Sequence, residues 1–137
     1  MDKNTLESLL KHAKSARNNS YSPYSGFRVG AALLAASGNI YSGTNVVAEL
    51  INQENASYGG AICAERSAFV AAVSAGERKF VAIAIVTDKE KSISPCGMCR
   101  QFMVEFGKDL KVIKYSTVTL LVSNLSFFTN EFVILHV

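Results

Sequence analysis

The chain has 137 residues, of which 49% are hydrophobic and 18% charged, and this composition excludes a mainly disordered protein. That length is enough to bury a full hydrophobic core, so we expect a single domain over residues 1–137. Fourteen Lys and Arg against eleven Asp and Glu leave a net charge of +3. The basic residues are scattered along the chain, which argues against a nucleic-acid partner and favours a small neutral or weakly anionic one.

The distribution of apolar residues and cysteines sets further limits. No stretch reaches the roughly 18 unbroken apolar residues of a membrane span, so no membrane partner is expected. The N-terminus lacks the apolar core of a signal peptide, which favours a cytoplasmic location. The chain has three cysteines, which we therefore expect to be reduced. The spacing of Cys96 and Cys99 favours a metal site over a disulfide.

The first half of the chain predicts one helix and one hairpin. From Thr5 onward, Leu and Ala recur at helical spacing, with Asn4 placed as the N-cap and Glu7 three residues after it. A turn-forming segment follows, and two apolar runs then flank a Ser-Gly-Asn turn. These runs predict the arms of an antiparallel hairpin, Val29–Ala36 and Ile40–Val46.

The second half of the chain alternates helices and strands. Cys63–Ala75 and Cys96–Phe106 are each followed by a glycine that can end a helix. Phe80–Thr87 has the continuous apolar run of a buried strand, and Leu110–Ile113 predicts another. Residues 115–137 are rich in Val, Leu, Phe, Thr and Ser and predict one or two more strands. The order of these elements is that of an α/β fold.

Both predicted helices in this half begin at a cysteine. Positions three apart on a helix share a face, so Cys96 and Cys99 can reach one ion, with Cys63 as a third ligand from the other helix. His12 and His136 lie near opposite ends of the chain, and neither has ligand spacing. Structural zinc sites normally use four protein ligands, whereas catalytic sites keep one position for water. Three ligands without a fourth therefore favour a catalytic zinc.

Glu65 and Arg66 follow Cys63 in the expected first turn of its helix. Glu65 would lie close to the metal without the spacing to bind it, where it could carry a proton between water and a leaving group. Arg66 and the two helix N-termini would offset the charge of three thiolates. Taken singly, Cys63 could be a buried hydrophobe, Glu65 a first-turn carboxylate and Arg66 a solvated charge. Their combination favours a catalytic site over these separate structural explanations.

Four segments of the sequence carry a family resemblance: 21–34 (YSPYSGFRVGAALL), 54–58 (ENASY), 63–66 (CAER) and 94–101 (SPCGMCRQ). Together they resemble the cytidine deaminases, in particular the small homotetrameric class with three cysteine zinc ligands. The resemblance runs from about residue 6 to residue 113. It implies a three-layer α/β/α cytidine-deaminase-like fold, with a central mixed sheet of about five strands and helices on both faces.

The resemblance implies hydrolytic deamination of free cytidine or deoxycytidine to uridine or deoxyuridine plus ammonia, a step of pyrimidine salvage. A zinc-activated water would attack C4 of the base while Glu65 relays protons to N3 and to the departing ammonia. Cys63, Cys96 and Cys99 would hold one zinc ion per subunit, and Arg66 would donate a hydrogen bond to a thiolate. The partners implied are a nucleoside substrate and three further copies of the chain.

The family's substrate contacts carry over by position. Phe27 would stack on the pyrimidine, although core packing explains this residue equally well when it is taken alone. Glu54 would accept a hydrogen bond from the ribose 3′-hydroxyl. The remaining pocket positions are three with lining side chains, Asn55, Ala56 and Tyr58, and two whose backbone would read the base edge, Ala64 and Ser94.

The sequence departs from the family pattern at two places. The family runs Gly-x-Asn-Val-Glu-Asn-Ala-Ser-Tyr without interruption, whereas residues 47–53 here separate Asn45 from Glu54. Flanking sequence favours Asn45 as the ribose-binding residue, while the i, i+2 spacing to Glu54 favours Asn52. Residues 115–137 also lack the family's strand, charged turn and helix, a change that can expose apolar surface or impair tetramer assembly.

Two other functions stay open on the sequence. The insertion and the divergent tail are also expected of a catalytically impaired, zinc-stabilised paralogue or aberrant isoform with a scaffold role. A deaminase of single-stranded RNA or DNA would need a basic groove with aromatic platforms, and usually has His where this chain has Cys63. The dispersed basic residues disfavour a polynucleotide, as does Glu54, which would repel a phosphate.

Overall fold

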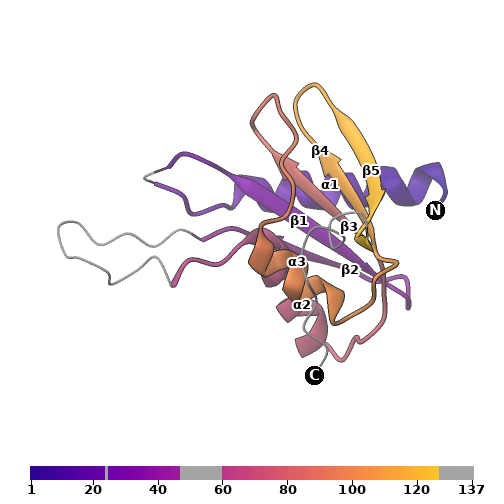
Figure 1. The fold of residues 1–137 in the computed structure, drawn as a ribbon. Helices are drawn as coiled ribbons and strands as arrows, with labels where there is room; N and C mark the ends of the chain where they lie inside the picture. The colour runs from indigo at the N-terminus through magenta and orange to yellow at the C-terminus, as the bar shows by residue number, and fades with distance from the viewer. Residues whose placement is uncertain (24, 47–59, 127–137) are drawn as a thin grey trace.

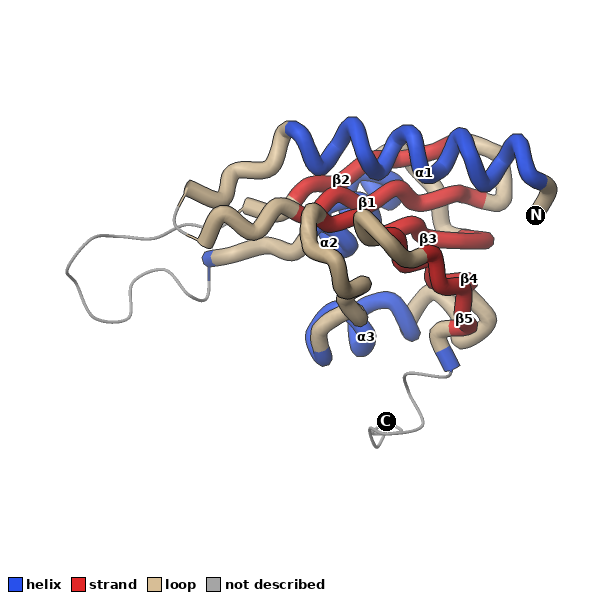
Figure 2. Tube along the Cα trace, turned by 90° about the horizontal axis from the view of Figure 1, so that it is seen from above, coloured by secondary structure: helices blue, strands red, loops and turns tan. Residues whose placement is uncertain are grey.

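The computed structural model describes residues 1–23, 25–46 and 60–126. In this part of the chain, three helices and five strands form an α/β/α arrangement, as expected from the resemblance (Figure 1). Seen from above, α1 runs along one face of the sheet, while α2 and α3 lie on the other (Figure 2). The elements are α1 (Lys3–Asn18), β1 (Val29–Ala35), β2 (Ile40–Thr44), α2 (Ala64–Ser74), β3 (Phe80–Thr87), α3 (Gly97–Val104), β4 (Lys111–Tyr115) and β5 (Leu120–Asn124).

The sheet is mixed, with strand order β2-β1-β3-β4-β5. β1 pairs antiparallel with both β2 and β3, and β4 pairs antiparallel with β5. β3 and β4 are parallel, because the chain crosses over through α3 between them. The expected mixed sheet of five strands with helices on both faces is therefore confirmed.

The alternation of side chains along β1 builds a core on each face of the sheet. Ala31 and Leu33 face α2 and α3, where they join a cluster that includes Phe69 and Met103. Ala32 and Leu34, the alternate residues of the same strand, face α1 and pack with Leu9. Because both faces are covered, all seven residues of β1 are buried and its sequence is apolar throughout.

The first helix begins two residues earlier than the sequence predicts, and its cap is a different residue. The N-cap is Asp2, whose carboxylate accepts hydrogen bonds from the Thr5 backbone nitrogen at 2.8 Å and from the Thr5 hydroxyl at 2.9 Å. Asn4 lies inside the helix, so the expectation that it caps the helix is wrong. Asp2 wins because its carboxylate reaches the third helical residue, which is the geometry of an N-cap.

Most other element bounds agree with expectation to within one to three residues. Phe80–Thr87 is a strand over the whole predicted range, and its last six residues are buried. β4 extends two residues beyond the predicted end because it pairs with β3 as far as Tyr115. β5 is the one strand found in the described part of the predicted 115–137 region. No helix in the described ranges is long and apolar enough to cross a membrane.

Candidate active site

Two helix N-termini bring the three cysteines together. Cys63 is the N-cap of α2, Cys96 is the N-cap of α3, and Cys99 lies in the first turns of α3. Their sulfur atoms all lie within 4.8 Å of one another, and the Sγ atoms of Cys63 and Cys96 are 3.8 Å apart. Over residues 1–23, 25–46 and 60–126, this is the one group of three or more His, Cys, Asp or Glu side chains close enough to hold an ion. The predicted convergence of three thiols is confirmed.

The donor set fits zinc. Thiolate sulfur binds Zn²⁺ at about 2.3 Å, and tetrahedral geometry at that bond length places two sulfurs about 3.8 Å apart. The separation of 3.8 Å between Cys63 and Cys96 agrees with this value. None of the three cysteines forms a disulfide. Because no fourth side chain joins the group among the described residues, its composition is that of catalytic rather than structural zinc sites.

The thiols are held in an environment that favours charge on Cys63. The neighbouring Cys99 thiol, and to a smaller extent Arg66, lower the pKa of Cys63 to about 5 against the opposing effect of burial. The Arg66 guanidinium donates from Nη2 to the Cys63 sulfur at 3.8 Å and to the Ala61 carbonyl oxygen at 3.5 Å. Arg66 thus contacts a ligand sulfur, as the sequence predicts, and can offset part of the negative charge of three thiolates.

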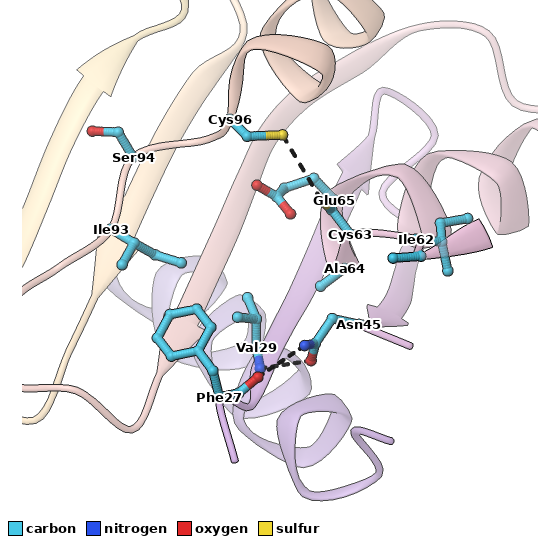
Figure 3. Close-up of a pocket in the computed structure, with 11 residues that line it drawn as sticks. Phe27, Val29, Asn45, Ile62, Cys63, Ala64, Glu65, Ile93, Ser94 and Cys96 are labelled. Carbon is cyan, nitrogen blue, oxygen red and sulfur yellow. Dashed lines mark hydrogen bonds between the residues drawn. The ribbon is translucent and has the colours of Figure 1, made fainter. Parts of the chain in front are cut away.

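Glu65 is buried in the first turn of α2, with 4% of its surface exposed. Burial raises the pKa of its carboxyl group to about 7, with a smaller contribution from the Cys63 thiolate. Figure 3 shows the carboxyl group pointing into the space that Phe27 and Ile93 border. A carboxyl group with a pKa near neutrality can both hold and release a proton at physiological pH.

Glu65 and two of the cysteines border a pocket of about 390 Å³, within the size range of small-molecule sites (Figure 3). The segment before β1 supplies Phe27, whose ring is half-buried. Asn45 follows directly after β2, Ala64 begins α2, and Ser94 lies in the segment before α3. The structure therefore places these four residues, predicted from separate parts of the sequence, around one cavity.

The predicted ribose contacts can be located only in part. Asn45 borders the pocket but is 7% exposed, and its side chain is hydrogen-bonded to neighbouring protein groups. The remaining predicted substrate contacts lie outside the described residues, as does the 47–53 insertion. These contacts are Asn52, Glu54, Asn55, Ala56 and Tyr58.

Sequence reasoning missed the apolar part of the pocket wall. Val29, Ile62 and Ile93 line the cavity alongside the predicted residues. No sequence signal separates these side chains from ordinary core residues, because their types are those of any buried strand or loop. They make much of the cavity apolar, as is usual for small-molecule sites.

Three sulfurs and a buried carboxyl group meet at two adjacent helix starts within an α/β/α sandwich, and this is the composition of a protein with a catalytic zinc site. Comparison with known proteins gives the family. The family model for the cytidine and deoxycytidylate deaminase zinc-binding region matches residues 3–115. The chain belongs to this family, and Cys63, Cys96 and Cys99 are its zinc-binding cluster.

Individual relatives agree with this assignment. The chain is 50% identical to a cytidine deaminase from Sporosarcina psychrophila over 101 residues, which cover 74% of this chain and 69% of the relative. It is 46% identical to a probable cytidine deaminase from Dictyostelium discoideum, over 82% of this chain and 72% of the relative. Among solved structures, a cytidine deaminase from Burkholderia pseudomallei superposes with a TM-score of 0.78 at 41% identity, covering 93% of this chain and 95% of that one.

Proposed function

We propose that the chain is a zinc-dependent cytidine deaminase that converts free cytidine or deoxycytidine, with one water, to uridine or deoxyuridine and ammonia. The observation that carries the proposal is the buried Glu65 carboxyl group beside the three-sulfur cluster, in one pocket with an aromatic ring. Membership of the deaminase family and the printed activity of relatives about 50% identical support it.

The Cys63, Cys96 and Cys99 thiolates would hold the zinc ion, since their number and spacing match its tetrahedral preference. When bound, zinc supplies a water-derived nucleophile at neutral pH. Arg66 keeps a positive charge against the Cys63 sulfur and so stabilises the thiolate form of that ligand.

Glu65 carries the protons of the reaction. Its carboxylate would take one proton from the attacking water and deliver it to N3 of the base. It would then take the second water proton from the new C4 hydroxyl and deliver it to the amino group, as the C4–N bond breaks and the C4 carbonyl forms. Burial keeps the carboxyl group away from bulk water, so the protons stay within the site. Replacing the amino group by a carbonyl oxygen and releasing ammonia balances the addition of one water.

Phe27 and the backbone at Ala64 and Ser94 orient the base. The half-buried Phe27 ring offers a flat apolar surface to the pyrimidine, and a stacked pair of this kind is worth about 0.5–1.5 kcal/mol beyond the area it buries. Ala64 at the start of α2 and Ser94 before α3 border the pocket, and their backbone groups would hydrogen-bond the polar edge of the base. Orientation of C4 toward the metal cluster follows from these two constraints.

Turnover of the zinc-loaded chain tests the proposal. We expect cytidine and deoxycytidine to lose their characteristic absorbance at a rate proportional to the enzyme concentration, with one ammonia released per nucleoside. A Cys63→Ala variant should lose both zinc and activity. A chain that binds zinc through Cys63 and yet turns over neither nucleoside would contradict the proposal and favour a scaffold role.

The homotetramer expected from the resemblance belongs to this proposal. Native mass spectrometry of the zinc-loaded chain should give four subunits with four zinc ions. A zinc-loaded monomer would show that assembly differs in this chain, independently of whether it deaminates cytidine.

A further inference from the structure

A set of contacts beside the pocket lies just beyond the end of the ladder between β1 and β3. These strands are antiparallel, and their pairing ends at Val29, the first residue of β1. Continuing the same register outward places Arg28 opposite Asp88, and Phe27 opposite Lys89. Because side chains alternate along an extended chain, Phe27 shares the pocket face with Val29, while Arg28 is directed to the face covered by α1.

The Asp88 carboxylate uses both of its oxygens in ion pairs. Its Oδ2 atom accepts from Nε of Arg28 at 2.7 Å, and its Oδ1 atom lies 3.0 Å from Nη1 of Arg17. Arg17 belongs to the last turn of α1, so one carboxylate joins the end of α1, the segment before β1 and the segment after β3. The three side chains are between 21% and 44% exposed, so water screens these pairs less than it screens fully exposed ones.

The residue after Asp88 contacts the aromatic ring itself. Nζ of Lys89 lies 5.8 Å from the centroid of the Phe27 ring, within the range of a cation–π interaction. Two consecutive residues after β3, Asp88 and Lys89, therefore contact two consecutive residues before β1, Arg28 and Phe27. The ion pair fixes the residue next to the ring, and the lysine lies over the ring.

The segment that carries the ring needs such contacts from outside. Phe27 follows Gly26, whose φ of 59° lies in a region that glycine enters without strain and that leaves the chain free to turn. On the side of β2, the Asn45 side chain donates to the Phe27 carbonyl oxygen at 2.9 Å. On the side of β3, Asp88 supplies the corresponding contact through Arg28. Figure 3 shows the ring that results from this placement at the pocket wall.

We propose that Asp88 is a positioning residue for substrate binding: its ion pairs with Arg28 and Arg17 hold Phe27 where the ring stacks on the base. The inference rests on the proposed function in that it takes a pyrimidine nucleoside as the ligand. Asp88 makes its contribution without touching the nucleoside, because its two oxygens are paired with arginines.

Loss of the carboxylate charge should act on binding through the population of ring positions. When the ring occupies the stacking position for only part of the time, the apparent affinity for the base falls by that fraction. Uridine, the expected product, carries no net charge, so a direct electrostatic effect of Asp88 on this ligand is small. A change in uridine affinity in Asp88→Asn therefore reports the ring.

The first measurement follows the ring without any ligand. The chain has no tryptophan, so Phe27→Trp introduces a single fluorescent reporter at the ring position. We expect Asp88→Asn in this background to raise the amplitude of the nanosecond motion in time-resolved anisotropy by about two- to threefold, the difference between rigid and flexible segments. This result does not depend on the proposed function.

The second measurement is the Kd of uridine on the zinc-loaded chain by calorimetry, where no reaction takes place. Asp88→Asn keeps the size of the side chain and removes its charge. We expect it to raise the Kd about fivefold, as for a partly exposed ion pair. In a Phe27→Ala background the same change should alter the Kd by less than about twofold, because the effect passes through the ring.

Two further variants complete the test. Asp109→Asn makes the same substitution at an exposed aspartate before β4 that does not line the pocket, and should leave both the motion and the Kd unchanged. Arg28→Gln removes the other partner of the shorter ion pair, and serves if Asp88→Asn does not fold. We expect Arg28→Gln to raise the Kd in the same direction, again only when the Phe27 ring is present.

Three outcomes would overturn the inference. The first is a Kd in Asp88→Asn equal to that in Asp109→Asn, even if the melting temperature falls. The second is an Asp88→Asn penalty of the same size with and without the Phe27 ring, and the third is unchanged motion of the Phe27→Trp reporter. A wild-type chain that binds uridine but does not deaminate cytidine would count against the proposed reaction alone, whereas a wild type that binds no uridine would count against both.

Discussion

Gly43 of β2 packs directly against the backbone of α2 at Ala68. A Cβ atom added at Gly43 would overlap the Ala68 backbone nitrogen and the Ala64 carbonyl oxygen. Cys63 and Glu65 lie at the start of α2, so this contact sets the distance between the sheet and these two residues of the site.

Gly43→Ala is therefore expected to push α2 away from the sheet. Overpacking of this kind costs about 1–3 kcal/mol, so the free energy of unfolding in urea should fall by that amount. Zinc affinity and turnover should fall as well, because Cys63 moves with the helix. Gly60→Ala is the matched control, since an added Cβ there meets nothing within 4 Å. Equal stabilities for the two variants would contradict the proposed contact.

Cys99→Ala removes a fully buried member of the metal cluster. Zinc content should fall from one ion per chain to near zero. At free zinc a thousandfold above the wild-type Kd, the wild type should exceed the variant in unfolding free energy by about 4 kcal/mol from zinc binding alone. A chelator should lower the melting temperature of the wild type but leave that of Cys99→Ala unchanged. A variant that kept stoichiometric zinc would show that Cys99 is not a ligand.

Arg66→Gln tests the cation beside Cys63. Outer groups that hydrogen-bond metal ligands typically contribute about 10–100-fold to metal affinity, and we expect a loss in this range from competition with a zinc chelator. Arg78→Gln removes an arginine that bonds the Val73 carbonyl oxygen near the other end of α2, and should leave zinc affinity unchanged. Equal zinc affinity in Arg66→Gln and the wild type would contradict the role given to the 3.8 Å contact with Cys63.

Glu77, between α2 and β3, accepts hydrogen bonds from the turn that joins β1 and β2, and its effect on stability depends on pH. Hydrogen bonds from Ser37, and to a smaller extent from Asn39 and Tyr41, hold the pKa of Glu77 below its ordinary value of 4.5. A carboxyl group with a lowered pKa in the folded state stabilises the protein fully above its unfolded-state pKa and loses this effect as the pH falls through the folded value. The difference in unfolding free energy between wild type and Glu77→Gln should thus be constant at neutral pH and shrink in acid below about pH 4.5.

Glu7→Gln is the control for that comparison, because Glu7 is exposed on α1 and its ion pair is with Lys3, which is exposed as well, at 3.8 Å. Its difference from wild type should stay small over the whole range. If the Glu77→Gln difference stayed constant down to pH 3, the hydrogen bonds to Glu77 would not favour its charged form.

The parts of the site that follow from local sequence were predictable. The two helices that begin at Cys63 and Cys96 were predictable because each has a helical pattern that ends at a glycine. The i, i+3 spacing of Cys96 and Cys99 places their sulfur atoms on one face of the second helix. The strand Phe80–Thr87 was predictable over its whole length because a strand buried on both faces has a continuous apolar run.

The parts that depend on distant contacts were not. Asn45 was a candidate for the ribose, but nothing in the sequence shows that Ser20, Phe27 and Val29 meet its side chain, since strand register brings them together. The first helix shows a local failure: both Asp2 and Asn4 are good caps by type, and only the geometry selects Asp2. The apolar pocket residues Ile62 and Ile93 carry no signal in the sequence that separates them from core.

Glu65 is proposed to carry the protons of a deamination at the three-cysteine zinc cluster. The most direct test is the zinc content and cytidine turnover of Glu65→Gln beside the wild type and Glu7→Gln. We predict one zinc per chain in all three proteins and a loss of turnover of at least about 10²–10⁴-fold in Glu65→Gln alone, the usual contribution of a general acid–base group. Turnover in Glu65→Gln within tenfold of an active wild type, with zinc retained, would contradict the account.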